Sequence, residues 1–403
     1  MIQLNTRGAC PPPIRRLVPG EPSFMNAEKT LVRIPELDGL RGLAALGVLA
    51  SHFLNFWVPD RPAGFGPVFK AIFDARNYGV FGVDLFFVLS GFLISSLLIA
   101  DRESPAYYHD FYWKRVLRIL PVYFVHLALT MVFFRHWWGY ILLSMVFLVN
   151  FGGPLHIKTP GPTWSLAIEE QFYLLWPQAI RRMQPKHLYY LAIGLVLTSN
   201  ALRILVHLWH GGVYEAYTFY RCDGLAFGAL IAFQRFLPLE GNRIVRWSLA
   251  FFKSNLLLLA VVGVTVAVIA HEGNTVMARE LRLTTANLLF YRVVRFIVFH
   301  RGRTLPWLAT APAVYLGSVS YALYMYQGFV VIKAEQWLGH IPASHVGAIC
   351  VRAILVVAVL LVLCTISRYA IELPAQRLRR FVLRQRQVPT IVVQKGEHPK
   401  PAL

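Results

Sequence analysis

Charged residues are scarce in this sequence, and acidic residues are half as frequent as basic ones. Asp, Glu, Lys and Arg make up 15% of the 403 residues, whereas soluble domains carry about a quarter. Hydrophobic residues make up 56%. This balance excludes an ordinary soluble globular protein. The positions of the 40 basic residues along the chain decide what their surplus over 20 acidic ones means.

The sequence also has few cysteines, and its first residues contain no apolar leader segment. The first 30 residues hold three consecutive prolines, Pro11 to Pro13, and no apolar stretch. We therefore expect no cleavable signal peptide, and we expect the first membrane span to direct insertion. The cysteines form no CxxC pair, and two of them share one apolar run, so neither a disulfide framework nor a metal site is expected. They are Cys10, Cys222, Cys350 and Cys364.

Long apolar runs are what the sequence does have, such as residues 255–270 and 346–366. Runs of this length match the about 20 residues that a helix needs to cross a bilayer. The expected fold class is therefore all-α, a polytopic membrane helix bundle. Eleven apolar segments stand out, near residues 39–57, 81–100, 119–134, 138–151, 164–180, 187–209, 219–236, 248–270, 283–300, 313–333 and 346–367.

The basic residues reduce eleven segments to about ten transmembrane helices. Both ends of the sequence are rich in Lys and Arg, so the positive-inside bias puts both termini in the cytoplasm and requires an even number of spans. The shortest segment, 138–151, is interpreted as interfacial or re-entrant. Without it, the cytoplasmic parts hold 25 of the 40 Lys and Arg residues and the outer loops hold 8. The net charge of +20 is thus a topology signal and predicts no nucleic-acid partner.

Three parts are predicted along the chain. Residues 1–32 form a disordered cytoplasmic head, residues 33–375 form the membrane domain, and residues 376–403 form a basic cytoplasmic tail. No internal repeat and no appended soluble domain is visible in the sequence. The partner expected for most of the chain is therefore the lipid bilayer.

The first predicted span carries two ionisable residues, which are costly inside a membrane. Arg41 lies near its cytoplasmic end, and His52 follows eleven residues later, about 16 Å along a helix axis. Eleven steps of about 100° bring both side chains to one helix face. Two interpretations stay open: Arg41 extends to the inner surface while His52 marks the outer interface, or both line one cavity. The small residues between them allow close helix packing and favour the cavity.

Further polar residues interrupt later apolar segments. Asp84 either caps the second span or lies beside His52, where a carboxylate orients an imidazole and raises its basicity. Other polar positions are Asn200, Arg203 and His207 on one helix face, Arg221 and Asp223, which either pair with each other or serve a site, and Arg292 and Arg295.

The cytoplasmic segment FYWKRVLRILPVYF, residues 111–124, combines basic and aromatic side chains. It is either a positive-inside anchor with an aromatic belt or a rim that grips an anionic, nucleotide-like cofactor. Both interpretations stay open at this point. The residues assigned to cofactor binding under the second interpretation are Arg41, Lys114, Arg115, Arg118 and Tyr123.

The segment GPTWSLAIEEQFYLLWP, residues 161–177, takes two adjacent glutamates, Glu169 and Glu170, into a predicted span. Adjacent side chains point about 100° apart on a helix, so at most one of them faces a cavity well. Packing alone does not explain paired acids in an apolar helix, and ionisable residues there mark functional sites.

Taken together, these segments resemble the acyltransferase 3 family, the integral-membrane O-acyltransferases of bacterial surface polysaccharides. An arginine, ten residues and a histidine occur together with the EEQFY block, which makes the match specific. The matching blocks run in family order over about residues 33–375, and they are LDGLRGLAALGVLASHF, GVDLFFVLSGFLIS, FYWKRVLRILPVYF, TWSLAIEEQFYLLWP, CDGLAFGALIA and GSVSYALYMYQ.

The resemblance implies about ten helices and transfer of an acyl group, commonly acetyl from cytoplasmic acyl-CoA, to a sugar hydroxyl. It also implies that His52 and Arg41 form the essential pair and that the EEQFY block is important. Gln327 stands where the family often has a histidine, so hydrogen bonding, rather than an acid or base role, is what carries over to this side chain.

The function expected is a membrane O-acyltransferase of the bacterial inner membrane, acting on a surface or exported carbohydrate. Acyl-CoA serves as co-substrate, with no tightly bound cofactor and no metal. The residues assigned to catalysis are His52, Arg41, Glu170 and Asp84, and those assigned to acceptor binding are Glu169, Glu170, Asp223 and Gln327. Two alternatives stay open: a proton-coupled transporter or flippase of a polar substrate, and an acyltransferase acting on a small glycoside.

Overall fold

The protein is helical throughout the part that the computed structural model describes, which is residues 34–57, 76–134, 136–157, 161–210, 216–239, 242–272, 275–300, 305–339 and 346–384. Within these ranges no strand is present. The predicted head and most of the predicted tail lie outside them. The α-helices are α1 (Pro35–Trp57), α3 (Gly82–Ala100), α4 (Tyr107–Phe133), α5 (Trp138–Met145), α6 (Thr163–Arg182), α7 (Pro185–His210), α8 (Thr218–Phe236), α9 (Arg243–Lys253), α10 (Asn255–Glu272), α11 (Val276–Phe299), α12 (Ala311–Leu338), α13 (Val346–Ser367) and α14 (Leu373–Arg384).

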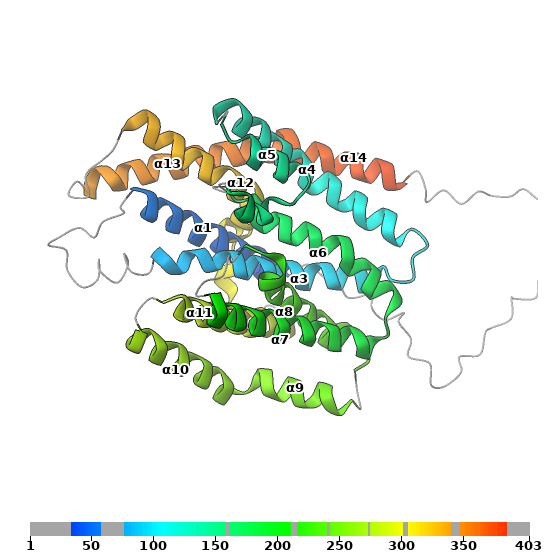
Figure 1. Ribbon diagram of the computed structural model, residues 1–403. Helices are drawn as coiled ribbons and strands as arrows, with labels where there is room; N and C mark the ends of the chain where they lie inside the picture. Colours follow the sequence, from blue (N-terminus) through cyan, green and yellow to red (C-terminus); the bar gives the residue numbers. More distant parts are fainter. Residues whose placement is uncertain are drawn as a thin grey trace, which may run out of the picture.

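Short helical turns join some of these helices. They are the 3-10 turns η2 (Arg76–Phe81), η3 (Val149–Phe151), η4 (Gly153–Leu155) and η5 (Pro306–Ala309), and the π-helical turn η6 (Arg368–Glu372). The long helices lie side by side in layers (Figure 1). Helices α1, α3, α6 and α12 occupy the middle, α7, α8 and α11 lie on one side with α9 and α10 beyond them, and α4, α5, α13 and α14 lie on the other side.

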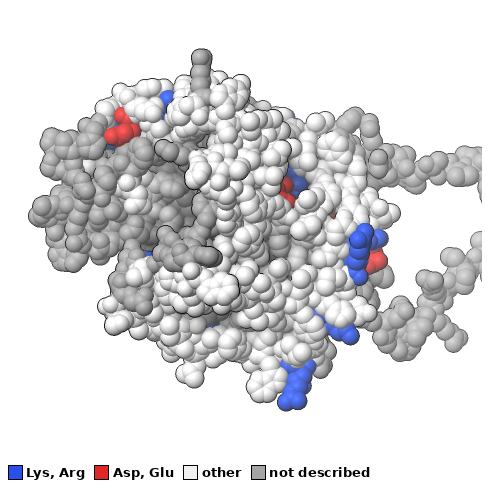
Figure 2. Space-filling model, viewed as in Figure 1, with Lys and Arg blue, Asp and Glu red and all other residues white. Residues whose placement is uncertain are grey.

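Five of the described helical segments are long and apolar enough to cross a membrane, and six if the bent pair α9 and α10 counts as one span. The five lie within Pro35–Asn55, Gly79–Ala100, Tyr107–Phe133, Pro185–Trp209 and Gly347–Leu378. The view in Figure 2 agrees, because the described surface there is mostly uncharged, and the largest areas of Lys and Arg lie on the right-hand side. These features define a multi-pass membrane protein, while the count of ten spans and the orientation of the termini stay predictions.

Helix α8 does not pass this test, because three charged residues interrupt it: Arg221, Asp223 and Arg235. It is nevertheless buried by other helices along nearly its whole length. Its charged groups therefore face protein rather than lipid, which is how ionisable residues are tolerated inside membrane proteins.

The span predicted over residues 248–270 is not one continuous helix. The chain breaks between α9 and α10 at Ser254, whose backbone is extended, and the two helices meet at 54°. Arg292 of α11 stabilises the break, because it donates to the Ser254 carbonyl at 3.2 Å and to the Asn255 side chain at 2.5 Å. Arg292 therefore bonds the helix break rather than lining a substrate path.

The short segment 138–151 contains α5 and the turn η3. An eight-residue helix such as α5 is about 12 Å long, less than half of the roughly 30 Å of a hydrocarbon core. This agrees with its interpretation as an interfacial or re-entrant segment. Tyr123 of α4 fixes the end of α5, because its hydroxyl donates to the Ser144 carbonyl at 2.7 Å.

Glycines set the close approach of α3 to α8. A Cβ atom at Gly91 of α3 would collide with the backbone of Leu225 on α8, and one at Gly228 of α8 would collide with the Val88 carbonyl on α3. Small residues at such crossings let helix backbones approach, which is a main source of helix association in membranes.

We expect a Gly228→Ala substitution to destabilise the protein by about 1–3 kcal/mol, because the added methyl overpacks the α3–α8 crossing. Gly263 on α10 is the matched control, since nothing lies within 4 Å of a Cβ built there. Alanine in an open helical position gains up to about 1 kcal/mol over glycine. Thermal unfolding of the purified Gly228→Ala and Gly263→Ala variants in detergent measures the two changes in stability. Equal changes at the two positions would show that Gly228 is not needed for the close approach of α3 and α8.

Candidate active site

A small cavity lies between α1, α3, α6 and α12. It is the meeting point of the segments that the sequence singled out, because each of these four helices supplies polar side chains to its wall. Those side chains are Arg41, Ser90, Ser165, Glu169, Ser320, Tyr321 and Tyr324.

Arg41 enters the cavity from α1. The neighbouring residue, Gly42, has room for no Cβ because Leu316 and Gly317 of α12 pack directly against it. The guanidinium of Arg41 is close enough to interact electrostatically with Glu169 and Arg115, and its Nε makes no hydrogen bond to the described residues. Arg41 therefore offers an unused donor to a ligand in the cavity.

Glu169 faces Arg41 from α6 and is held from two sides. Its Oε1 accepts a hydrogen bond from Ser90 of α3 at 3.1 Å, and its Oε2 accepts one from the Tyr173 hydroxyl at 2.7 Å. The guanidinium of Arg115 lies over the Tyr173 ring, 4.4 Å from its centroid. The chain thus fixes the position of the one acid that lines the cavity.

Three arginines, Arg41, Arg115 and Arg118, lie near one another. Arg118, one turn along α4 from Arg115, is close enough to interact electrostatically with both Arg41 and Arg115. A carboxylate from η6, Glu372, also lies within this range of Arg118. Clustered guanidiniums are suited to phosphate and carboxylate groups, because their forked donors bind such anions with two parallel hydrogen bonds.

His52 lies further along α1. The helix is unbroken from Arg41 to His52, so the two residues keep the one-face relationship that their spacing predicts. The imidazole is exposed and does not line the cavity itself. It stands about 16 Å along the helix axis from Arg41, so one α-helix connects the cation cluster to the histidine.

The other predicted site residues on α4 and α6 lie outside the cavity. The ammonium of Lys114 pairs with Asp101 at 3.0 Å, and the Tyr123 ring is buried against Phe147. Glu170 points away from the cavity lining, as expected for the neighbour of Glu169, and its Oε1 is buried without a hydrogen bond to the described residues. Gln327 of α12 is fully buried, and neither its amide nitrogen nor its oxygen bonds to a described residue.

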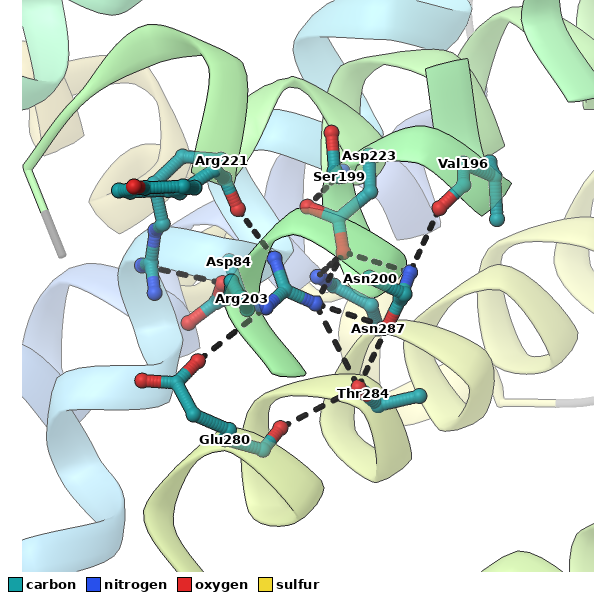
Figure 3. A network of polar contacts seen from close by, with 12 residues as sticks. Asp84, Val196, Ser199, Asn200, Arg203, Arg221, Asp223, Glu280, Thr284 and Asn287 are labelled. Atoms are coloured by element: carbon teal, nitrogen blue, oxygen red, sulfur yellow. Dashed lines mark hydrogen bonds and ion pairs between the residues drawn. The ribbon is translucent and has the colours of Figure 1, made fainter. Parts of the chain in front are cut away.

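A second polar cluster joins α3, α7, α8 and α11 (Figure 3). Arg203 lies at its centre, 2.8 Å from Asp223 and 3.2 Å from Glu280. Arg221 faces Asp84 at 3.1 Å. All five side chains are at most 5% exposed. We call this set of five the buried ion cluster.

Amide and hydroxyl groups complete the buried ion cluster. Asn200 accepts from Arg203 at 2.8 Å, Asn287 donates to Asp223 at 3.2 Å, and Thr284 donates to Asn200 at 2.5 Å. Arg203 also donates to the Tyr220 carbonyl. Hydrogen bonds of this number are what a buried ion pair needs to offset its desolvation, so the cluster ties four helices together.

The alternative that Arg221 and Asp223 pair with each other is wrong. Residues two apart on a helix do not face each other, and here Arg221 reaches α3 while Asp223 reaches α7 and α11. The expectation of a shared face for Asn200 and Arg203 is confirmed by their hydrogen bond. Arg295 donates to Gln234 at 3.0 Å and thereby joins α11 to α8.

Two partners of predicted residues were not singled out by the sequence, namely Glu280 of α11 and Glu372 of η6. Ser90 and Tyr173 lie within sequence blocks that were singled out, but their hydrogen bonds to Glu169 were not predicted. Tyr173 stands four residues after Glu169, the spacing of neighbours on a helix.

Comparison with known proteins shows the family to which this chain belongs. A family model described as an acyltransferase domain matches residues 34–368, so the chain belongs to this acyltransferase family. The relatives include YrhL of Bacillus subtilis strain 168, 28% identical over 85% of this chain and 54% of its own length, and the peptidoglycan O-acetyltransferase OatA of Listeria monocytogenes, 26% identical over 85% of this chain and 56% of its own length.

The O-acetyltransferase OatA of Staphylococcus aureus is 30% identical over 50% of this chain and 34% of its own length. The chain spans about half the length of the first two relatives. No solved structure matches it significantly. The matches show an acyltransferase family, and they lend no support to a transporter or flippase.

Proposed function

We propose that this protein moves an acetyl group from acyl-CoA on the cytoplasmic side of the bacterial inner membrane to a hydroxyl of a carbohydrate that is exposed or exported. The names of the OatA relatives support O-acetyl transfer, and the name of the Listeria protein supports peptidoglycan as acceptor. The donor is the part of the proposal that rests on the geometry of this chain.

The observation that carries the proposal is that Arg41 lines a cavity that also holds Glu169, while Arg115 and Arg118 lie within electrostatic range of Arg41. Four carboxylates lie within electrostatic range of these arginines, yet Arg41 Nε makes no hydrogen bond to the described residues; the carboxylates are Asp38, Glu169, Glu170 and Glu372. CoA carries phosphate groups that such forks bind, with its acyl thioester at the far end of a flexible arm. An anionic donor therefore accounts for the hydrogen-bond donor that Arg41 leaves unused beside the cavity.

His52 is assigned the proton transfer. The imidazole takes the proton of the acceptor hydroxyl, whose oxygen forms the ester bond to the acyl carbon while the bond from that carbon to sulfur breaks. The imidazolium then returns the proton to the departing CoA thiolate, so CoA leaves as the free thiol. An imidazole is suited to both steps, since its ordinary pKa lies near neutral pH.

Asp84 and Asp223 belong to the buried ion cluster in this proposal rather than to the reacting groups. Their carboxylates pair with arginines at 3.1 and 2.8 Å. Glu170 and Gln327 keep their predicted roles near the acceptor, and both have polar atoms that bond to no described residue.

The donor assignment is tested by binding. We expect Arg41→Gln and Arg115→Gln each to weaken acetyl-CoA binding by about 10- to 100-fold, the worth of a hydrogen bond to a charged group. Calorimetric titration of acetyl-CoA into the full chain in nanodiscs measures this. Arg246→Gln on α9 is the matched control, since that arginine is exposed and distant from the cavity lining. Unchanged affinity in both cavity variants would exclude this donor site.

A further inference from the structure

The cavity between α1, α3, α6 and α12 has a polar end and an apolar end. Ser90 bonds to Glu169 at the polar end. One to two turns back along the same two helices, the Phe87 and Trp164 rings meet with centroids 6.4 Å apart. Tyr324 of α12 joins this second level through a 2.6 Å hydrogen bond to Ser165. This end, called the apolar end, is lined by Val83, Phe86, Phe87, Leu166 and Met325, together with Ser165 and Tyr324, whose hydroxyls bond to each other.

The walls of the apolar end are firmly packed. Phe87 is 1% exposed and Met325 is fully buried. Behind Phe87 lies the guanidinium of Arg221, 5.7 Å from the ring centroid, and Asp84 holds this guanidinium in turn. Phe86 packs against Tyr324 with ring centroids 5.9 Å apart. A close-packed wall of this kind resists added volume, because forcing in extra methylenes displaces side chains and backbone.

The apolar end lies between the donor arginines and the histidine. Gly82, next to Val83 on α3, packs directly against Ala44 and Val48 of α1. His52 stands one turn beyond Val48 on α1, and Arg41 stands two turns before it. A group carried by a donor anchored at Arg41 therefore passes this apolar end on its way to His52.

We propose that the apolar end is the subsite for the acyl chain of the donor, and that Phe86 and Met325 restrict this chain to the two carbons of acetyl. The proposal rests on the acyl-CoA donor proposed above and adds its chain-length selection. The short chain lies with its methyl group against the apolar wall, while the polar end binds the charged part of the donor. A longer chain must displace Phe86 or Met325, because both are backed by packed neighbours.

The test is the binding of acetyl-CoA, propionyl-CoA and butyryl-CoA to the full chain in nanodiscs. Discrimination by one methylene in an apolar pocket is about 10- to 200-fold, so we expect the wild-type protein to bind butyryl-CoA at least about 10-fold more weakly than acetyl-CoA. Phe86→Ala and Met325→Ala are expected to reduce this difference to less than about threefold, since each removes part of the wall. Phe296→Ala on α11, a largely exposed phenylalanine away from the cavity, is the matched control and keeps the wild-type difference.

Two results overturn the proposal in distinguishable ways. If the wild-type protein binds the three donors equally, or if both wall variants keep the wild-type difference, the acyl subsite is wrong while the donor site stands. If the wild-type protein binds none of the three, the donor site falls and the acyl subsite falls with it. Should Phe86→Ala fail to fold, Met325→Ala decides alone.

Discussion

A His52→Ala protein is expected to lose acyl transfer by about 100- to 10,000-fold, the usual contribution of a positioned general base. The loss should appear in kcat rather than in donor binding, because His52 stands about three turns beyond Arg41 and takes no part in anchoring the donor. Acetyl-CoA consumption and ester formation by the full chain in proteoliposomes measure the rate, and calorimetric titration measures the donor affinity.

The matched control for His52 is His187→Ala. His187 is exposed on α7 and lies outside the cavity lining, so its loss should leave both rate and affinity unchanged. A His52→Ala protein that inserts normally and still transfers acetyl at the wild-type rate would remove the proposed base.

An Arg203→Met protein is expected to be about 3–5 kcal/mol less stable than the wild type. Arg203 contacts both Asp223 and Glu280, and all three side chains are at most 2% exposed. Removing the arginine leaves two buried carboxylates without their cation, which is far more costly than the net worth of the ion pairs themselves. Reversible unfolding in mixed detergent micelles measures the difference in free energy.

Arg246→Met on α9 serves as the control for Arg203, because exposed substitutions away from special features usually change stability by no more than about 0.5 kcal/mol. Equal stability of the two variants would show that the buried ion cluster does not tie α7, α8 and α11 together. Arg221 of the same cluster lies behind Phe87. An Arg203→Met protein that is as stable as the wild type but selects donors differently would therefore contradict a structural role of Arg203.

Sequence patterns predicted the local features well. Apolar runs predicted most helices, and the eleven-residue spacing predicted the shared face of Arg41 and His52 on the unbroken α1. The geometry of adjacent residues predicted that only one of Glu169 and Glu170 would face the cavity, and Glu169 does. These features depend only on the period of the helix, which the sequence displays directly.

Contacts between distant segments were beyond such patterns. Arg221 pairs with Asp84, more than 130 residues earlier, and Glu169 is bonded by Ser90 from another helix. Which helices meet is set by close approaches such as that of Gly91 and Gly228 at the α3–α8 crossing. The hydrophobic periodicity of a single segment does not indicate which other helix it will contact. The break at Ser254 was missed for the same reason, because the bonds that support it come from α11.

The ionisable residues of the two polar clusters have different roles. The buried ion cluster pairs its arginines with carboxylates and is closed off by protein. Around the cavity, Arg41 keeps an unused donor and Arg115 stacks on Tyr173 instead of pairing directly with an acid. An arginine with an unused hydrogen-bond donor beside a cavity is suited to bind an anion, so we propose the donor site there and not at the buried ion cluster.

The central claim is that a donor held at the arginine-lined cavity yields its acetyl group through His52. The most direct measurement uses proteoliposomes containing the full chain, with radiolabelled acetyl-CoA on one side and soluble peptidoglycan glycan strands on the other. The account predicts alkali-labile label on the glycan with the wild-type protein, and none above background with Arg41→Gln or His52→Ala. Label formed equally by the wild type and both variants, or acetyl-CoA left intact by the wild type, would contradict it.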